Sequence, residues 1–323
     1  MKNWFARVFG GAAHAGTDRP AHASATAPQE AQQALQPDLH LDLAFHRWLA
    51  GPAVHVGETK DALILDELAR LARDPQAAAE LVPRVPAVVP QLLRSLREEG
   101  VSATELARQV AQDVTLVAEV IREVNSPYYR PTAPVRTIEG ALMLLGQNGL
   151  RMLLARVAFR PVISAQTGRL ARQAAPQLWR QSEQCALAAS LAAPSLGADA
   201  FEACLAGLAR NVGLVVALRL IDQVDAAGRL PQSDHFAHAL HDSARTLSAR
   251  IAAQWELPPP VAAAILQSGQ DGGPPLAQAL RTGERLATLH VLRASSVEGA
   301  QDAVDRLPDA QRRLFDKLGG TDE

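Results

Sequence analysis

Two polar residues lie side by side inside an apolar stretch, AGLARNVGLVV, which runs from Ala206 to Val216. Apolar residues recur there at the spacing of one buried helix face: Leu205, Leu208, Val212 and Val215. Asn211 lies beside that face, where a polar group needs a hydrogen-bonding partner. Its neighbour Arg210 adds a charge that is fixed at neutral pH. This pair is the first candidate for a chemical role.

A second candidate is the stretch HFAHALHDSARTL, which contains a literal His-Asp pair at His241 and Asp242. His235, His238 and Asp242 are spaced i, i+3 and i+7, so these side chains can share one helix face and hold a metal ion. The alternative is a solvent-exposed histidine cluster in the first turns of a helix. Both interpretations are open from spacing alone.

A third candidate is the stretch NSPYYRP, which holds the only two tyrosines, Tyr128 and Tyr129. Asn125 and Ser126 precede them and can hydrogen-bond the end of a helix. The structural interpretation is a helix stop whose rings pack the junction between two subdomains. The functional interpretation is an exposed aromatic surface that binds a partner protein.

Patterns of common catalytic sites are absent. We identify no Ser/His/Asp set, no glycine-rich phosphate loop and no dinucleotide fingerprint. Six arginines can line a basic surface that accepts phosphate: Arg151, Arg156, Arg160, Arg169, Arg172 and Arg180. No recognised nucleic-acid motif accompanies them, so we interpret them as dispersed solubilising charge.

The composition is that of a globular protein. The 323 residues are 48% hydrophobic and 20% charged, and the net charge of −2 gives no general attraction to nucleic acid or anionic membranes. Cys185 and Cys204 lie in separate helix-like segments without a CxxC pattern, which predicts free buried thiols in a reducing cytoplasm. No apolar run approaches about 18 residues, so we expect no membrane span.

The elements that position these residues are predicted to be helices. Ser102 and Glu105 form a capping box at the start of one helix. Thr137 can cap the helical segment IEGALMLLG, and Gly146 interrupts the helix there. Further helices are expected at Pro176–Ala193, Ala200–Gln223, Phe236–Trp255, Pro260–Ser268 and Leu276–Arg293. No alternating strand is evident. The predicted fold class is all-α, a two-lobed helical bundle.

Five stretches in a fixed order carry a family resemblance: LVPRVPAVVPQLLRSLREEGVSATELARQVAQDVTLVAEVIREVNSPYY, VRTIEGALMLLGQNGLRMLL, LWRQSEQCALAASLA, CLAGLARNVGLVV and AAQWELPPPVAAAI. Together they resemble the HDOD domain of bacterial signalling proteins. Each motif is weak alone, and the order makes the resemblance specific. It covers about residues 78–270.

The resemblance implies a lost metal site, because the HDOD family is related to the HD phosphohydrolases. Their motif typically reads aaLLHDiG where this chain has AGLARNVG, so Arg210 takes the place of a ligand His and Asn211 that of a ligand Asp. Gln181, in LWRQS, takes the place of another ligand His. Arginine offers no lone pair and asparagine lacks the carboxylate charge. We therefore expect no metal, no cofactor and no catalytic residue.

Two consequences follow from this alignment. The Arg210 guanidinium can fill the vacated metal position and bind a carboxylate or amide; the alternative is a solvent-exposed helix residue. The His-Asp pair at His241 and Asp242 lacks the flanking residues of the family's dyad and lies too late in the motif order. We therefore expect the histidines there to form the solvated cluster.

The resemblance implies a non-catalytic regulatory or protein-interaction module in bacterial signal transduction, which meets signalling proteins in trans in the cytoplasm. The alternatives are a metal-dependent HD-type phosphohydrolase with displaced ligands, and a nucleic-acid or nucleotide-binding module. The predicted organisation is a disordered tail (1–36), a helical extension (37–75), the HDOD domain (76–293) and a C-terminal helix and tail (294–323). The lobes of the domain are expected at about 78–165 and 170–293.

Overall fold

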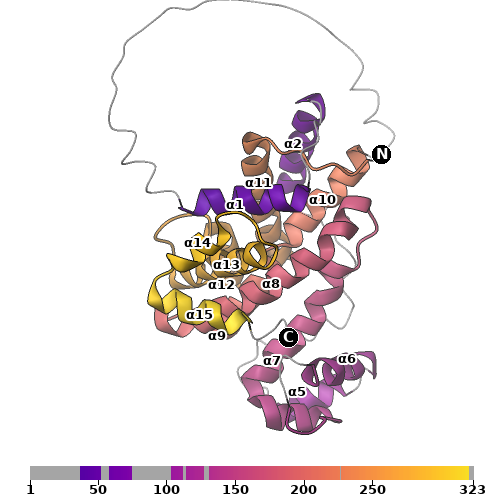
Figure 1. The fold of residues 1–323 in the computed structure, drawn as a ribbon. Coiled ribbons are helices and arrows are strands. Elements are labelled where there is room, and N and C mark those ends of the chain that lie inside the picture. The colour runs from indigo at the N-terminus through magenta and orange to yellow at the C-terminus, as the bar shows by residue number, and fades with distance from the viewer. Residues whose placement is uncertain are drawn as a thin grey trace, which may run out of the picture. The chain divides into compact units, whose positions relative to one another are not determined.

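The computed structural model describes residues 37–51, 58–74, 103–111, 114–126, 131–225 and 227–319. Throughout these ranges the regular elements are helices and no strand occurs, so the all-α prediction is confirmed (Figure 1). The described residues from Asp38 onward belong to one compact unit. The predicted tail, Ser102 and both tyrosines lie outside the described residues.

The helices keep the labels of Figure 1. In chain order they are α1 (Pro37–Ala50), α2 (Glu58–Arg73), α5 (Ala103–Val110), α6 (Val114–Val124), α7 (Ile138–Ser164), α8 (Arg169–Leu196), α9 (Ala200–Ala209), α10 (Val212–Val224), α11 (Asp234–Gln254), α12 (Pro259–Gln267), α13 (Pro275–Ala294), α14 (Ala300–Asp305) and α15 (Asp309–Leu318).

The long helix α8 is the centre of the packing, because α9 and α13 both run against it (Figure 1). Glycines let these backbones approach closely. A Cβ atom at Gly207 of α9 would lie 2.5 Å from Ala186 Cα, and one at Gly283 of α13 would lie 2.6 Å from the Cys185 carbonyl oxygen. Small residues therefore give this chain, which is poor in aromatics, a close-packed core.

Helix α8 begins earlier than the sequence predicted and contains Pro176 within it. Its first turn is capped by a side chain distant in sequence, Asp222 of α10. The carboxylate accepts hydrogen bonds from Leu170 N at 2.8 Å and Ala171 N at 3.0 Å. These bonds satisfy two of the free N–H groups at the helix start and hold α8 and α10 together.

Helix α7 follows the predicted signals. Thr137 caps it by accepting a hydrogen bond from Gly140 N at 3.0 Å. Gly146 interrupts the helical backbone with a φ of 68°, a left-handed conformation that favours glycine. The helix packs with α5 and α6 and also with α8 and α9.

One predicted helix is in fact two, because α9 and α10 are separated at Arg210 and Asn211. Glycine at 213 lets α10 approach α11: a Cβ atom there would lie 2.0 Å from the Ala244 carbonyl oxygen. Ser248 of α11 bridges the break. Its Oγ accepts from Gly213 N at 2.8 Å and donates to the Arg210 carbonyl at 2.5 Å. The backbone groups freed by the break are therefore paired.

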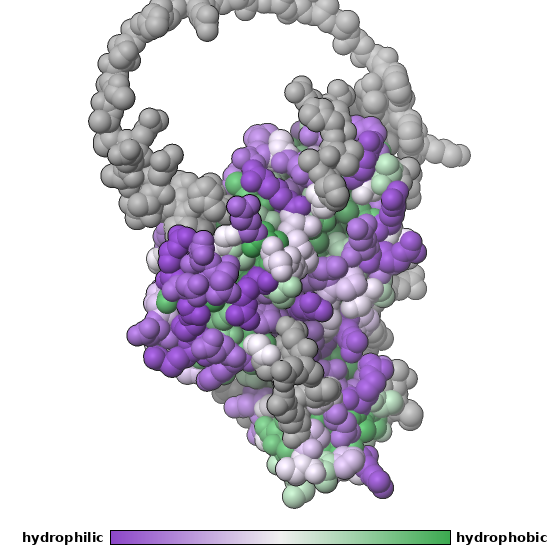
Figure 2. All heavy atoms as spheres, in the orientation of Figure 1, coloured by the Kyte–Doolittle hydropathy of each residue, from purple (hydrophilic) through white to green (hydrophobic). Residues whose placement is uncertain are grey.

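The C-terminal helices present a charged outer face. On the side shown in Figure 2, hydrophilic side chains gather over α14 and α15. Phe315 and Leu318 are the buried residues of α15, and the Phe315 ring lies 5.5 Å from the His290 ring of α13. Helix α15 is therefore amphipathic and packs onto α13 through its apolar face.

Among the described residues, one segment is apolar enough to span a membrane by length and composition, so the prediction that no apolar run approaches about 18 residues was too strong. It runs from Ala200 to Val224, and 89% of the apolar window is buried inside the protein. It is α9 and α10, whose apolar residues form the core. Cys185 and Cys204 are also buried and are free thiols, as predicted.

Candidate functional site

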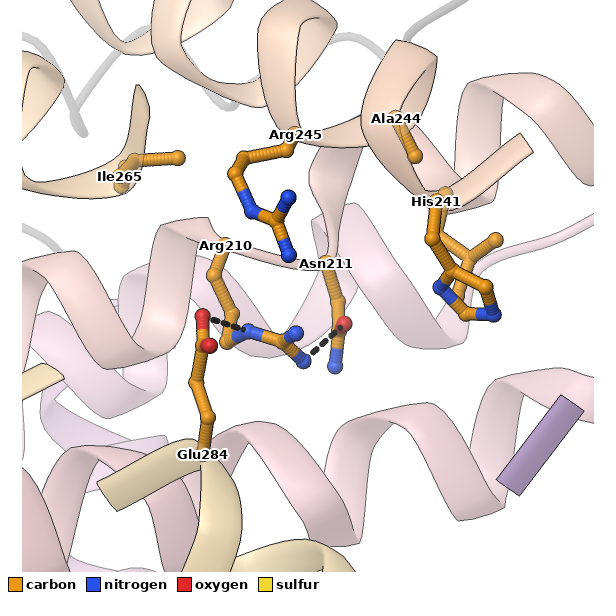
Figure 3. A pocket seen from close by; sticks show the side chains of 8 residues that line it. Arg210, Asn211, His241, Ala244, Arg245, Ile265 and Glu284 are labelled. Carbon is orange, nitrogen blue, oxygen red and sulfur yellow. Dashed lines mark hydrogen bonds and ion pairs between the residues drawn. The ribbon is translucent and has the colours of Figure 1, made fainter. Parts of the chain in front are cut away.

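Arg210 is the centre of a buried polar cluster at the α9–α10 break (Figure 3). Its Nε donates to Glu284 Oε1 of α13 at 2.5 Å. Its Nη1 donates to Asn211 Oδ1 at 2.9 Å and to Gln181 Oε1 of α8 at 3.2 Å. The guanidinium therefore binds one carboxylate and two amides inside the protein instead of extending into solvent.

Asn211 and Gln181 complete this cluster. Asn211 Nδ2 donates to Gln181 Oε1 at 2.6 Å and to Ser182 Oγ at 2.9 Å. Gln181 Nε2 in turn donates to Thr288 Oγ1 of α13 at 3.2 Å. Gln181 and Asn211 are almost fully buried. The three residues that the family alignment singled out are thus in mutual contact, and each buried amide has partners.

The Arg210–Glu284 pair is an ion pair shielded from water. The two side chains are 15% and 14% exposed. Burial opposes the charge of Arg210, but the neighbouring carboxylates of Glu284 and Asp42 outweigh it and raise the pKa of Arg210. Ser268 Oγ also donates to Glu284 Oε1 at 3.2 Å. The cation therefore persists at every physiological pH.

This arrangement does not fit a divalent metal ion. The side-chain oxygens of Gln181 and Asn211 already accept hydrogen bonds from the Arg210 guanidinium. Glu284 is the anionic member of the cluster, and its Oε1 is bound by the same guanidinium. A metal ion needs ligands with free electron pairs, and an adjacent fixed cation repels it. Nowhere in the described ranges does a group of three His, Cys, Asp or Glu side chains lie together as ligands.

A small pocket opens beside the ion pair (Figure 3). It is lined by Arg210, Asn211, Leu214, His241, Ala244, Arg245, Ile265 and Glu284. Its cavity volume is about 20 Å³, which is room for one or two water-sized groups. Arg245 points into it towards Arg210 and Asn211 (Figure 3). The lining therefore combines charged and amide groups with the apolar side chains of Leu214, Ala244 and Ile265.

The expectation of a solvated histidine cluster is wrong for His241. His235 and Asp242 are exposed, whereas His241 lines the pocket, and burial lowers its pKa well below the usual range. Its ring centroid lies 5.5 Å from that of His46 on α1. His46 Nε2 donates to the Pro231 carbonyl at 2.7 Å. The helix turns His241 away from the face that His235 and Asp242 share, so His241 does not belong with the exposed residues of that face.

Asn125 has a structural role at the end of α6. Its Nδ2 donates to the Ile121 carbonyl and the Val135 carbonyl, each at 2.7 Å, and its Oδ1 accepts from Val135 N at 2.8 Å. Ser126 continues the turn through its backbone N–H, which donates to the Glu123 carbonyl at 3.0 Å. Asn125 therefore ties the helix end to the segment that precedes α7. The role of Tyr128 and Tyr129 stays a prediction.

The arginines between residues 151 and 180 do not share one free basic surface. Arg156 is buried between Glu123 of α6, at 3.0 Å, and Glu183 of α8, at 2.5 Å. The Arg151 guanidinium lies 4.3 Å from the Phe201 ring centroid. The sequence analysis interpreted these arginines as dispersed solubilising charge. Arg156 instead belongs to an internal ion-pair network, because Glu123 and Glu183 are in direct contact with it.

Comparison with known sequences identifies the family. Residues 82–270, more than half of the chain, match the HDOD domain. The chain belongs to the HDOD family. An uncharacterized protein of Treponema pallidum (strain Nichols) is 24% identical over 191 residues, which is 56% of this chain. The matching region spans 36% of that relative's own length.

Solved structures share the fold of this HDOD protein. A candidate metal-dependent phosphohydrolase from Shewanella amazonensis SB2B has a TM-score of 0.56 at 16% identity, covering 82% of this chain and all of that one. An HDOD domain protein of unknown function from Geobacter sulfurreducens has a TM-score of 0.51 at 22% identity, with 79% and 88% covered. A candidate signal transduction protein from Marinobacter aquaeolei VT8 has a TM-score of 0.56 at 19% identity, with 80% and 65% covered.

Four residues of the site were missed at the level of sequence. Glu284, Ser268 and Arg245 belong to later helices, and no local pattern connects them with Arg210. His241 was noticed but assigned to the solvent. The sequence analysis allowed a carboxylate or amide partner for Arg210, with a solvent-exposed helix residue as the alternative. The sequence carried no information on which residue the partner of Arg210 is.

Proposed function

We propose that this HDOD protein is a non-catalytic regulatory and protein-interaction module in bacterial signal transduction. The observation that carries the proposal is the buried Arg210 guanidinium, bound to Glu284, Gln181 and Asn211 at the positions that resemble the ligand positions of HD phosphohydrolases. The Marinobacter structure, described as a candidate signal transduction protein, supports the proposed class.

Hydrolysis of a phosphoester by HD-type chemistry requires a metal-activated water. In this chain the fixed charge of Arg210 and the engaged oxygens of Gln181 and Asn211 oppose metal binding at the corresponding positions. The rival function is a metal-dependent phosphohydrolase with displaced ligands, and the Shewanella neighbour favours it by its description. The two functions differ in whether the protein hydrolyses a phosphoester when a divalent metal is supplied.

We expect the purified full chain to hydrolyse neither bis(4-nitrophenyl) phosphate nor cyclic dinucleotides above the rate without protein. The assay includes manganese, ferrous iron or zinc in turn, under anaerobic conditions for iron. Release of 4-nitrophenol and chromatography of the nucleotides provide the readout. Metal-dependent turnover that disappears in both Asn211→Ala and Glu284→Gln would establish the rival function. Arg250→Ala, at an exposed position of α11, is the matched control.

The domain organisation and the cytoplasmic location belong to the same proposal. The free, buried thiols of Cys185 and Cys204 suit a reducing compartment. Burial raises the pKa of Cys204 to about 12, so this thiol is protonated and unreactive. The HDOD domain is proposed to span residues 76–293, with the flanking helices packed onto it.

A further inference from the structure

We propose that the pocket beside Arg210 receives the carboxylate of an acidic side chain from the partner protein. The inference rests on the proposed function and specifies the chemistry of its partner. Three features of the pocket support the inference: the charge of the largely buried Arg245 guanidinium, the unused hydrogen-bond donors of the two arginines, and the size of the pocket.

The charged residues that line the pocket are Arg210, Arg245 and Glu284. These are two cations and one anion, and the Asp42 carboxylate is a second anion close to Arg210. Glu284 is already bound by Arg210 and Ser268. The ion-pair partner of Arg245 is Asp242, whose side chain is 76% exposed, whereas the side chain of Arg245 is 19% exposed. A carboxylate so exposed is screened by water and balances the inner guanidinium poorly. Arg245 is therefore the cation of the pocket whose charge is balanced most weakly, and the space beside its guanidinium favours an anion.

Hydrogen-bond donors remain unused on both guanidinium groups. In the described part of the chain, Arg245 engages only its Nη1, which binds Asp242 at 3.0 Å. Arg210 engages its Nε and Nη1, which leaves Nη2 without a bond to any described residue. Figure 3 shows the Arg245 guanidinium directed at the space above Arg210 and Asn211. A carboxylate there can accept charge-assisted bonds from both arginines.

The location of Arg245 depends on a glycine. A Cβ atom at Gly269, just after α12, would lie 2.4 Å from Arg245 Nη1 and 2.6 Å from its Cζ. The guanidinium thus lies directly against the bare backbone of Gly269. Any larger residue at this position would displace the guanidinium from its place over the pocket.

The size of the pocket decides which anion fits. About 20 Å³ accommodates the head of one small group and leaves no room for the base and sugar of a nucleotide. The apolar lining residues Leu214, Ala244 and Ile265 suit contact with the methylene stem of a glutamate side chain. An acidic side chain on a protein surface therefore matches the pocket in charge, donors and volume.

The test uses the full chain and two acetylated, amidated peptides, one of four glutamates and one of four glutamines, with inorganic phosphate as a third probe. Binding is followed at low salt by the ¹⁵N–¹H signals of the arginine Nε groups. We expect the glutamate peptide to shift the Arg245 Nε signal and the glutamine peptide to leave it unchanged. Arg245→Gln should weaken binding about tenfold or more, the loss of one charge-assisted contact.

Two further variants keep the test decisive if Arg245→Gln folds poorly. Gly269→Ala retains the charge but displaces the guanidinium, and should also weaken binding. Arg250→Gln removes an exposed charge from the same helix and should leave binding within about twofold. An unshifted Arg245 signal, or equal weakening by Arg250→Gln, overturns the inference. Tighter binding of phosphate than of the glutamate peptide at this pocket also overturns it.

The failure of this inference is distinguishable from failure of the proposed function. Metal-dependent hydrolysis of a phosphoester would refute the proposed function, regardless of whether the glutamate peptide binds. If the protein hydrolyses no phosphoester and also fails to bind the glutamate peptide, only the inference of an acidic partner is refuted.

Discussion

Arg210→Ala is expected to lower the free energy of unfolding by about 3–5 kcal/mol. The substitution removes one partner of a buried ion pair and leaves the Glu284 carboxylate, at 14% exposure, without its cation. It also leaves Asn211 Oδ1 without its donor, whereas Gln181 Oε1 keeps the hydrogen bond from Asn211 Nδ2. The measurement is urea unfolding at neutral pH, followed by circular dichroism.

The control for this loss is Arg250→Ala, which removes an arginine from the exposed face of α11 and should change stability by less than about 0.5 kcal/mol. A double variant, Arg210→Met with Glu284→Leu, should recover much of the stability, because replacing both charges leaves no unpaired ion. If Arg210→Ala behaves like Arg250→Ala, the guanidinium is hydrated and the buried pair does not exist.

Gly213→Ala is expected to destabilise the protein by about 2 kcal/mol, although alanine is the better helix former. In an isolated helix the change would favour folding by about 1 kcal/mol. Here the new Cβ atom would lie 2.0 Å from the Ala244 carbonyl oxygen and 2.7 Å from Ser248 N, both backbone atoms of α11. Such overpacking costs about 1–3 kcal/mol, and more when a backbone has to move.

The measurement for Gly213→Ala is again urea unfolding, with Gly319→Ala as the control. At Gly319 the added Cβ atom has nothing within 4 Å and φ is −68°, so alanine should be neutral or slightly stabilising there. Equal stability of the two variants would mean that α10 and α11 are further apart than the structure shows.

The sequence predicted the helices well where the signals are local. Thr137 and Gly146 act through their own side chain and backbone, so their cap and break were recognisable. The break between α9 and α10 was missed, because an apolar run gives no sign of the Ser248 hydroxyl that stabilises it. The early start of α8 was missed for a similar reason, since Asp222 caps it from another helix.

The candidate site was predictable in its identity but not in its contacts. Arg210, Asn211 and Gln181 were recognised because the family motif fixes their positions. Glu284 lies 74 residues after Arg210, and only the fold of α13 against α8 brings the two side chains together. Likewise, Arg245 became part of the site because α11 crosses α10 at Gly213.

The most direct test of the account is the metal content of the full chain after expression in medium enriched in manganese, iron and zinc. Elemental analysis of the purified protein should find none of these metals in stoichiometric amount, because Arg210 and its partners occupy the cluster. One metal ion per chain that is lost on Asn211→Ala and retained in Arg250→Ala would contradict the account.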